Sequence, residues 1–200
     1  PTRRSSDLES ENSFTKIVDD ILKDACEYLG ISAGALLREN QEQKTVDMIC
    51  EYAGGGREPQ MAKEQGVPKE ELPFFNGKPY MISSDSMMPE GFARLFAQKK
   101  LTAAVFLPVE VNGHAGMYLC FCESEKKKKW ENADVKFIND VKRIIQTILT
   151  KRITKNSLAS SYASLEAILE NVGCAIYVRD PQTGHILYAN EKYQKFFKKT

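Results

Sequence analysis

Cys120 and Cys122, with one residue between them, carry thiols, a reactive type of side chain, at a spacing that could allow them to act together in chemistry. Side chains two apart along a strand point to the same face, so these thiols would lie roughly 6–7 Å apart. Together with Cys50 and His114 they could bind a metal ion, or they could act as a nucleophilic and a resolving thiol. Structural zinc sites, however, use cysteine pairs with about two to four intervening residues, and the lysines that could lower the pKa of Cys120 begin only beyond Glu125. We therefore predict unreactive thiols that pack as small apolar side chains.

The two thiols belong to the second of the two most strongly predicted strands, Thr102–Val111 and Ala115–Glu123. Both strands are rich in Val, Phe and Tyr, and the intervening Asn112-Gly113 indicates a tight hairpin turn because both residues accept positive φ. Alternation along each strand divides its side chains between two faces. It separates Ala104, Phe106 and Pro108 from Val105, Leu107 and Val109, and it separates Tyr118, Cys120 and Cys122 from Met117, Leu119 and Phe121.

The elements before this hairpin follow from hydrophobic periodicity. An amphipathic helix that ends at Gly30 carries one apolar stripe from Phe14 to Leu29. Residues 53–77 show little periodicity and several Gly and Pro residues, which is typical of a lid or a binding loop. The remaining predicted elements are strands at Ala33–Leu37, Thr45–Tyr52 and Lys78–Ile82, and an amphipathic helix at Glu90–Lys100.

A long helix is predicted from about Ala133, and its apolar residues recur with a period of about 3.5 residues. This period predicts a parallel, left-handed coiled coil of two copies. Lys151 and Lys155 fall in the same register, and the serines that follow allow a kink or a break near residues 155–164. Alternatively, the first half packs on its own sheet and only the second half pairs. The side chains of the predicted dimer helix are Phe137, Val141, Ile144, Ile148, Leu158, Tyr162, Leu165 and Leu169.

Composition limits the classes of partner. The net charge is +1, with 28 basic and 27 acidic residues, so we expect no nucleic acid partner and no direct membrane contact. The run Lys126–Lys129 lies beside Glu123 and Glu125 and is predicted to be a solvated bend. No leader and no apolar run of about 20 residues is visible, and the odd number of cysteines, five, favours reduced thiols and a cytoplasmic location. The missing initiator Met is typical of a piece of a longer protein.

The order of the elements and their local motifs together resemble a GAF domain over about residues 10–150. The resemblance rests on Leu107-Pro108-Val109, Asn112-Gly113 and Gly116-Met117-Tyr118-Leu119 in the hairpin, and on Trp130–Asp134 before the last helix. It implies an α+β fold with a central antiparallel sheet of about five to six strands, N- and C-terminal helices on one face, and a long connecting helix. We assign residues 1–152 to this sensory domain and residues 153–164 to a helical linker.

Residues 165–200 resemble the beginning of a PAS domain. Leu165–Asn171 would be its first helix, and Ala175–Arg179 and Ile186–Ala189 would be its first two strands. Asp180 and Gly184 lie at the turn between those strands, and Asn190 follows where that family commonly has Asn. The resemblance stops before the parts of a PAS domain that contact heme or flavin, so it implies no cofactor, and the cofactors of the chain stay unknown.

The GAF resemblance implies a pocket on one face of the sheet, roofed by the irregular segment. The side chains expected to line this pocket are Phe74, Phe75, Tyr80, Phe92, Phe96 and Cys120. The sequence does not fix which face of the sheet the pocket occupies. The same aromatic residues could instead form ordinary core, and a filled pocket would leave a domain that serves only to dimerise.

Some GAF proteins bind a bilin or a cyclic nucleotide, and each of these functions has a sequence motif that can be sought here. Bilin-binding members typically join a Cys directly to a His, and no such pair occurs here. The cyclic-nucleotide signature, an Asn-Lys followed later by Phe and Asp-Glu, is also absent. A thiol-dependent reductase of free methionine sulfoxide, acting through Cys120 and Cys122, stays as an alternative.

The expected function is the sensory input region of a bacterial signalling protein. It would bind an unknown small molecule, form a homodimer, and control an output domain beyond residue 200, most of all one that makes or breaks cyclic-di-GMP. The chain itself is not expected to be an enzyme. The alternatives are the input region of a histidine kinase, the effector domain of a DNA-binding regulator, and a purely structural spacer.

Overall fold

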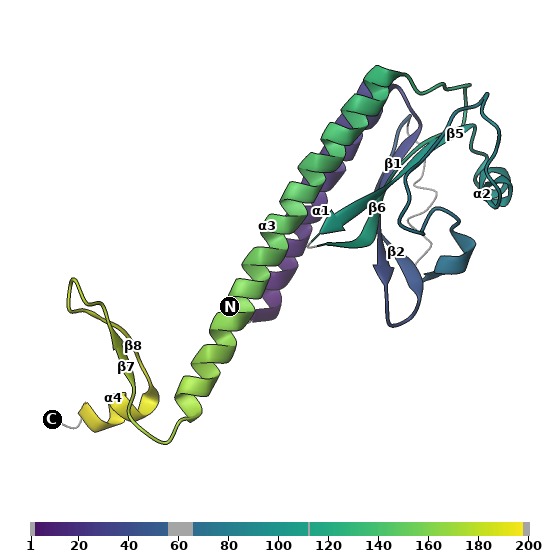
Figure 1. Cartoon of the computed structure of the whole chain (residues 1–200). Coiled ribbons are helices and arrows are strands. Elements are labelled where there is room, and N and C mark those ends of the chain that lie inside the picture. Colours follow the sequence, from purple (N-terminus) through teal and green to yellow (C-terminus); the bar gives the residue numbers. More distant parts are fainter. Residues whose placement is uncertain (1–2, 56–65, 112, 198–200) are drawn as a thin grey trace. The chain divides into compact units, whose positions relative to one another are not determined.

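The computed structural model describes residues 3–55, 66–111 and 113–197, with side chains from Ser13 onwards apart from that of His114 (Figure 1). The chain divides into two compact units, Pro1–Leu149 and Thr150–Thr200. Within the described ranges, no helix combines the length and the apolar content that crossing a bilayer requires.

The first unit begins with helix α1 (Arg3–Leu29) and ends within helix α3 (Asn132–Asn171). Between them lie β1 (Ala33–Asn40), β2 (Thr45–Ala53), β3 (Val67–Pro68), the 3₁₀ turn η1 (Lys69–Glu71), β4 (Tyr80–Ile82), α2 (Phe92–Lys99), β5 (Ala103–Val111) and β6 (His114–Glu123). The second unit contains the rest of α3, then β7 (Tyr177–Arg179), β8 (Ile186–Ala189) and α4 (Glu191–Phe197).

The sheet of the first unit has six strands in the order β3-β2-β1-β6-β5-β4, and every neighbouring pair is antiparallel. The predicted fold class is therefore confirmed. The β5–β6 hairpin lies at the predicted place, and Gly113 has the positive φ, 79°, that the turn requires. Asn112 lies outside the described residues. The strands β1 and β2 extend further than predicted, so the loop between them shortens to residues 41–44.

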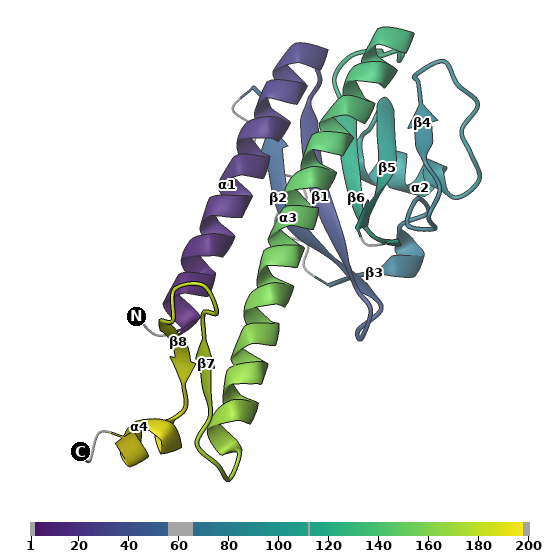
Figure 2. The ribbon, with the colours of Figure 1, turned by 60° about the vertical axis from the view of Figure 1, so that its left-hand side comes forward.

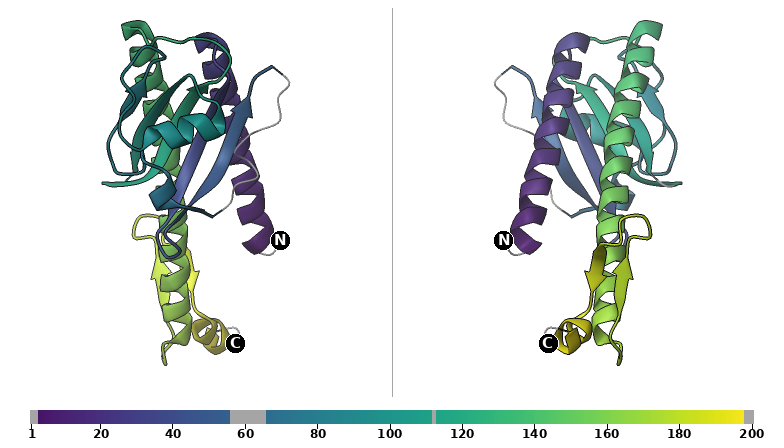
Figure 3. Two further views of the ribbon diagram at one scale, coloured as in Figure 1. Left: turned by 90° about the vertical axis from the view of Figure 1, so that its right-hand side faces the viewer. Right: turned by 90° about the vertical axis from the view of Figure 1, so that its left-hand side faces the viewer.

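The two faces of the sheet carry two separate cores. Helix α1 and the beginning of α3 cover one face, as Figure 2 shows, and α2 lies over the other face (Figure 3). Val105, Leu107 and Val109 point toward α1 and α3, whereas Ala104 and Phe106 point toward α2. The alternation predicted from the sequence is confirmed, and the structure adds which side belongs to the helices.

The helix-side core explains why α1 and α3 form where they do. Helix α1 buries an apolar stripe that runs from Phe14 to Leu29, and it ends at Gly30, whose φ is 60°. Gly34 on β1 allows this close packing, because a Cβ there would lie 2.9 Å from the Sγ of Cys26. The residues of α3 that are buried in this core are Ile138, Val141, Ile145 and Leu149.

Helix α3 continues without interruption from Asn132 to Asn171, so the expectation of a kink or break near residues 155–164 is wrong. The residues Leu165–Asn171 are accordingly the end of α3 and not a separate short helix. No Gly or Pro interrupts this stretch, and serine costs a helix only about 0.5 kcal/mol relative to alanine.

The predicted dimer side chains fall into two groups. Val141 is buried, and Phe137 and Ile148 are partly buried in the core of the first unit, so the first half of the seam packs mainly on its own domain. The ring of Phe137 also lies 4.2 Å from that of Tyr28 on α1. Exposed to solvent are Ile144, Leu158, Tyr162 and Leu165, while Leu169 is half-buried. Pairing of two copies stays a prediction.

The basic run Lys126–Lys129 starts in a bend, and Lys126, Lys127 and Lys129 are exposed, so the predicted solvated bend is confirmed for them; only Lys128 is half-buried. Lys128 forms a 2.8 Å ion pair with Asp134 and lies over the ring of Trp130, and its main chain exchanges hydrogen bonds with Ser84. The partners of Lys128 come from the start of α3 and from the segment after β4, which sequence neighbours alone do not reveal.

The second unit is organised around Asn190, which is fully buried. Its Nδ2 donates to the carbonyls of Leu169 and Cys174, and its Oδ1 accepts from the amides of Ile176 and Tyr193. The side chain thus connects the end of α3, the hairpin β7–β8 and the start of α4. The two strands lie close to their predicted positions, and the PAS resemblance stays a prediction.

Candidate functional site: the cavity under helix α2

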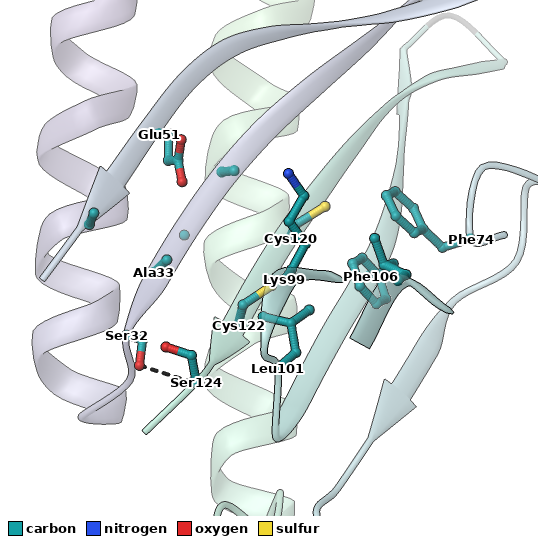
Figure 4. A pocket seen from close by; sticks show the side chains of 14 residues that line it. Ser32, Ala33, Glu51, Phe74, Lys99, Leu101, Phe106, Cys120, Cys122 and Ser124 are labelled. Carbon is teal, nitrogen blue, oxygen red and sulfur yellow. Dashed lines mark hydrogen bonds between the residues drawn. The ribbon is translucent and has the colours of Figure 1, made fainter. Parts of the chain in front are cut away.

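A cavity of about 40 Å³ lies between α2 and the face of the sheet that α1 and α3 leave open. We refer to it as the α2 cavity (Figure 4). Leu95 and Lys99 of α2 and the following Leu101 form its roof, and strands β1, β2, β5 and β6 form its floor. Phe74 closes one end.

The cavity exists because small side chains stand in register across four strands. The pairing places Ala33 opposite both Ala53 and Cys122, and Cys122 opposite Ala104. We call Ala53, Ala33, Cys122 and Ala104 the small-residue row; its first three members line the cavity. Because no member extends beyond a methyl or a thiol, a helix laid across the row cannot fill the space beneath it.

The adjacent row is larger and closes the cavity on one side. There Ala35 pairs with Cys120, Cys120 with Phe106, and Phe106 with Tyr80. Phe106 stacks on Phe74 with ring centroids 4.1 Å apart and planes 8° from parallel. Phe75, Phe92 and Tyr118 extend this aromatic cluster, and the Tyr118 hydroxyl accepts a hydrogen bond from the amide of Gly77.

The six side chains predicted to line a pocket thus lie on one face of the sheet, but only some of them line the α2 cavity. Phe74 and Cys120 line the α2 cavity. Phe75, Phe92 and Phe96 are buried in the core beside it, and Tyr80 borders a separate groove between β4 and α3. Their role in binding a ligand stays a prediction.

Sequence reasoning missed the small residues Ala33, Ala35 and Ala53 and the roof residues Leu95 and Leu101. The alanines carry a signal only once the strand register is known, because a lone alanine in a strand has no special meaning. The register joins β1 to β6, strands that are more than 70 residues apart in the sequence.

The polar groups at the mouth of the cavity already have partners. The Ser32 Oγ donates to Glu123 Oε1 over 2.6 Å and accepts from the Ser124 amide over 3.1 Å. Glu51 and Lys99 each make an interaction of their own. Apart from the Ser124 hydroxyl, the remaining lining is apolar or thiol, so most of the wall is suited to dispersion contacts rather than to hydrogen bonds.

The two thiols of the cavity are poor nucleophiles. Burial raises the pKa of Cys122 to about 12 and raises the pKa of Cys120 well above its usual range. Both are therefore thiols and not thiolates at neutral pH, whereas nucleophilic attack needs the thiolate. The protonated thiols disfavour the alternative that Cys120 and Cys122 reduce free methionine sulfoxide.

A thiol metal site is not assembled either. Cys50 lies in the helix-side core, on the opposite face of the sheet from Cys120 and Cys122, and the side chain of His114 lies outside the described residues. Within the described part of the chain, no three His, Cys, Asp or Glu side chains are grouped in a way that could hold a metal ion.

Comparison with known proteins gives a likeness in structure alone. No model of a protein family and no curated protein matches the sequence. The blue-light absorbing form of the PixJ GAF domain from Thermosynechococcus elongatus has a TM-score of 0.61 at 12% identity, covering 79% of this chain and 96% of that chain. GAF3 of Slr1393 from Synechocystis sp. PCC6803, in its photoproduct state, has a TM-score of 0.60 at 11% identity, covering 72% of this chain and 98% of that chain.

A phycoerythrobilin-bound GAF domain from a cyanobacterial phytochrome gives a TM-score of 0.62 at 8% identity, covering 77% of this chain and 94% of that chain. At these identities the likeness establishes the fold and nothing finer. The chain has a GAF-like fold, as its sequence predicts.

Proposed function

We propose that the chain is the sensory input region of a bacterial signalling protein, working in the cytoplasm, and that the first unit binds a small molecule in the α2 cavity. The observation that carries this proposal is the small-residue row, which leaves a lined space under α2 on the face of the sheet that the terminal helices leave open. Ligand sites are typically concave and mostly apolar, as this cavity is.

A bilin, such as the phycoerythrobilin bound by one of the similar GAF domains, does not fit this site. Pockets for drug-sized ligands have volumes of about 300–1,000 Å³, whereas the α2 cavity has about 40 Å³. Phe74, Phe106 and Tyr118 fill the neighbouring part of the face. The cavity thiols, with their raised pKa values, are also poorly prepared to form a thioether. The α2 cavity therefore gives no support to a light-absorbing role.

The ligand is proposed to act through the helices that flank the sheet. Helix α3 begins in the first unit and ends in the second, so a change in α3 is a direct route from one unit to the next. Lys151 and Lys155 are exposed within the predicted seam, where they let two pairings of the helix lie close in energy. A ligand then shifts the balance only through its differential affinity for the two states.

The output is proposed to be the synthesis or breakdown of cyclic-di-GMP, with a histidine kinase as the alternative. Residues 165–200 would form the beginning of a PAS domain between receptor and output. The support is the hairpin β7–β8 and the four hydrogen bonds of Asn190, which make an ordered unit of this segment.

A thermal-shift screen tests whether the first unit is a receptor. A ligand that binds only the folded state raises the apparent stability by RT ln(1 + [L]/Kd), about 2.7 kcal/mol at 100 times Kd. We expect at least one metabolite to raise the melting temperature of the whole chain and to lose this effect in Ala33→Leu, which fills the small-residue row. Failure of every compound would favour the structural spacer.

The same chain is proposed to form a parallel homodimer through α3. Ile144, Leu158, Tyr162 and Leu165 follow the 3.5-residue seam and are 51%, 56%, 66% and 52% exposed, respectively. A row of exposed apolar side chains along a continuous helix is typical of a surface that pairs.

Leu165→Glu should weaken the dimer by about 100-fold, which corresponds to about 3 kcal/mol, because it places a charge in the apolar seam. Sedimentation velocity over a range of concentrations measures this change. Ser160→Glu, which adds the same charge on the opposite side of α3, should leave the dissociation constant within about twofold. A wild-type chain that sediments as a monomer at every concentration would contradict the dimer.

A further inference from the structure

We propose that the α2 cavity is selective for a small, neutral, apolar molecule. This inference rests on the proposed receptor function and adds the chemical class of its ligand. The cavity volume of about 40 Å³ is far below the roughly 300–1,000 Å³ of pockets for drug-sized ligands, so only a compact molecule fits.

The shape of the space comes from the backbone register. Ala53 and Ala33 form one side of its floor and Cys122 and Cys120 the other. Leu95 and Leu101 lie above. Every one of these side chains ends in a methyl group or a protonated thiol, so the contacts on offer are dispersion contacts. A branched or compact hydrocarbon group matches them better than a planar heterocycle.

Polar ligands meet an unfavourable wall. The Ser32 hydroxyl donates its hydrogen to Glu123 and accepts from the Ser124 amide, so it has no free hydrogen to donate to a ligand. Glu51 and Lys99 each make an interaction of their own at the edge of the cavity, and the alanines, leucines and thiols that line the rest offer a polar ligand no strong hydrogen-bond partner. A buried polar group without a partner costs about 1–3 kcal/mol. This cost discriminates against polar molecules, whereas an apolar molecule loses nothing at the wall.

Helix α2, which roofs the cavity, is bounded at each end by a residue with positive φ. These residues are Gly91, with φ 86°, and Lys100, with φ 53°, both in the left-handed region. Such a conformation is uncommon for a residue other than Gly, Asn or Asp. The chain therefore keeps a locally unfavourable turn at the end of α2, next to Leu101, in the position that roofs the small-residue row.

The test uses the full chain and three named probes: xenon, isobutanol and isobutyrate. The last two have the same branched skeleton, but only isobutyrate carries a charge. Methyl-resolved NMR spectra follow Ala33, Ala35 and Ala53, which line the floor. We expect xenon and isobutanol to shift these three methyl signals saturably and isobutyrate to leave them unchanged.

Two variants locate the effect. Ala33→Leu, or the smaller change Ala53→Val if the first does not fold, should weaken binding of both apolar probes at least tenfold. Ala97→Leu makes the same change as Ala33→Leu on the exposed side of α2 and should leave binding unchanged. Shifts that persist in the filled variants, or an absence of saturable shifts in the wild type, would overturn the proposal.

The outcomes separate this inference from the receptor function. Saturable shifts of the same methyl groups by isobutyrate, or by a polar metabolite found in the thermal-shift screen, would refute the apolar class and leave the receptor intact. A metabolite whose full effect persists in Ala33→Leu would remove the α2 cavity from the function altogether.

Discussion

Replacing Phe106 with alanine is expected to lower the free energy of unfolding of the first unit by about 3–5 kcal/mol. Phe106 is 2% exposed, stacks on Phe74 over 4.1 Å and meets Phe92 at 5.8 Å. Its removal costs both the transfer of a phenyl ring and the stacking with Phe74. Because Phe106 borders the α2 cavity, the deletion also enlarges that cavity, and the neighbouring aromatic rings can collapse only partly.

Denaturant unfolding followed by Trp130 fluorescence measures this loss. Trp130 is the single tryptophan and is buried in the helix-side core, so its signal reports on the first unit and not on the second. Phe106→Leu keeps most of the volume and should cost about 1 kcal/mol. Phe196→Ala, at a ring that is 74% exposed in the second unit, should leave the Trp130 transition unchanged.

The enlarged cavity gives an independent measurement. Benzene should bind Phe106→Ala and restore part of the lost stability, as expected for a ligand that fills a dry apolar cavity. The wild type, with its aromatic cluster intact, should show no such gain. A loss below about 1 kcal/mol in Phe106→Ala, with no benzene effect, would mean that this cluster is loosely packed and that the face is more open than described.

The fold could be predicted from the sequence where the relevant signal is local. The period of two in β5 and β6 separates Phe106 from Leu107 without any knowledge of the sheet, since successive side chains must alternate. The stripe of α1 and the Asn-Gly turn are equally local signals. The face that meets α1 and α3 is decided by docking, and the sequence of the hairpin contains no trace of that choice.

The candidate site depends on contacts between distant strands, and this is why the sequence revealed only part of it. The aromatic residues were noticed because they are large. Ala33 and Ala53 were missed because what matters is their register with Cys122, which is set by pairing between β2, β1 and β6. A cavity forms where several neighbouring strands all carry small side chains at matching positions. The sequence alone draws attention to large side chains and does not show which small ones are neighbours.

The course of α3 shows the opposite error, in which a local signal was given too much weight. The serines and lysines near residue 157 lower helix propensity, but each by only a few tenths of a kcal/mol. Propagation of an existing helix adds a hydrogen bond for every residue fixed, so a weak stretch next to a well-packed one stays helical.

Glu123 is the residue for which sequence and structure differ most, and it leads to the second large effect. It appeared to be one of several acids beside a lysine run, yet it is 2% exposed. Its Oε1 accepts from the Ser32 hydroxyl and from the amides of Ser124, Glu125 and Lys126 over 2.6–3.3 Å. This carboxylate ends β6 and joins it to the start of β1, beside the mouth of the α2 cavity.

The pKa of Glu123 fixes the pH dependence of its contribution. Burial alone would raise this pKa, but the hydrogen bonds from Ser32 and the three amides outweigh burial and hold the pKa below its ordinary value of 4.5. A carboxyl group with a lowered pKa in the folded state stabilises fully above its unfolded pKa. This stabilisation is lost as the pH falls from about 4.5 through the lower folded pKa.

Glu123→Gln is therefore expected to cost about 2–3 kcal/mol at pH 7, because it replaces a charged acceptor of several hydrogen bonds by a neutral one. The difference between wild type and variant should shrink as the pH falls below about 4.5. Urea unfolding at a series of pH values, again followed by Trp130, measures both quantities. Glu90→Gln, at an exposed acid before α2, should cost less than about 0.5 kcal/mol at every pH. A deficit in Glu123→Gln that stays constant down to pH 3 would show that shape rather than charge holds this corner, and would contradict the assignment of Glu123 as the anion that joins β6 to β1.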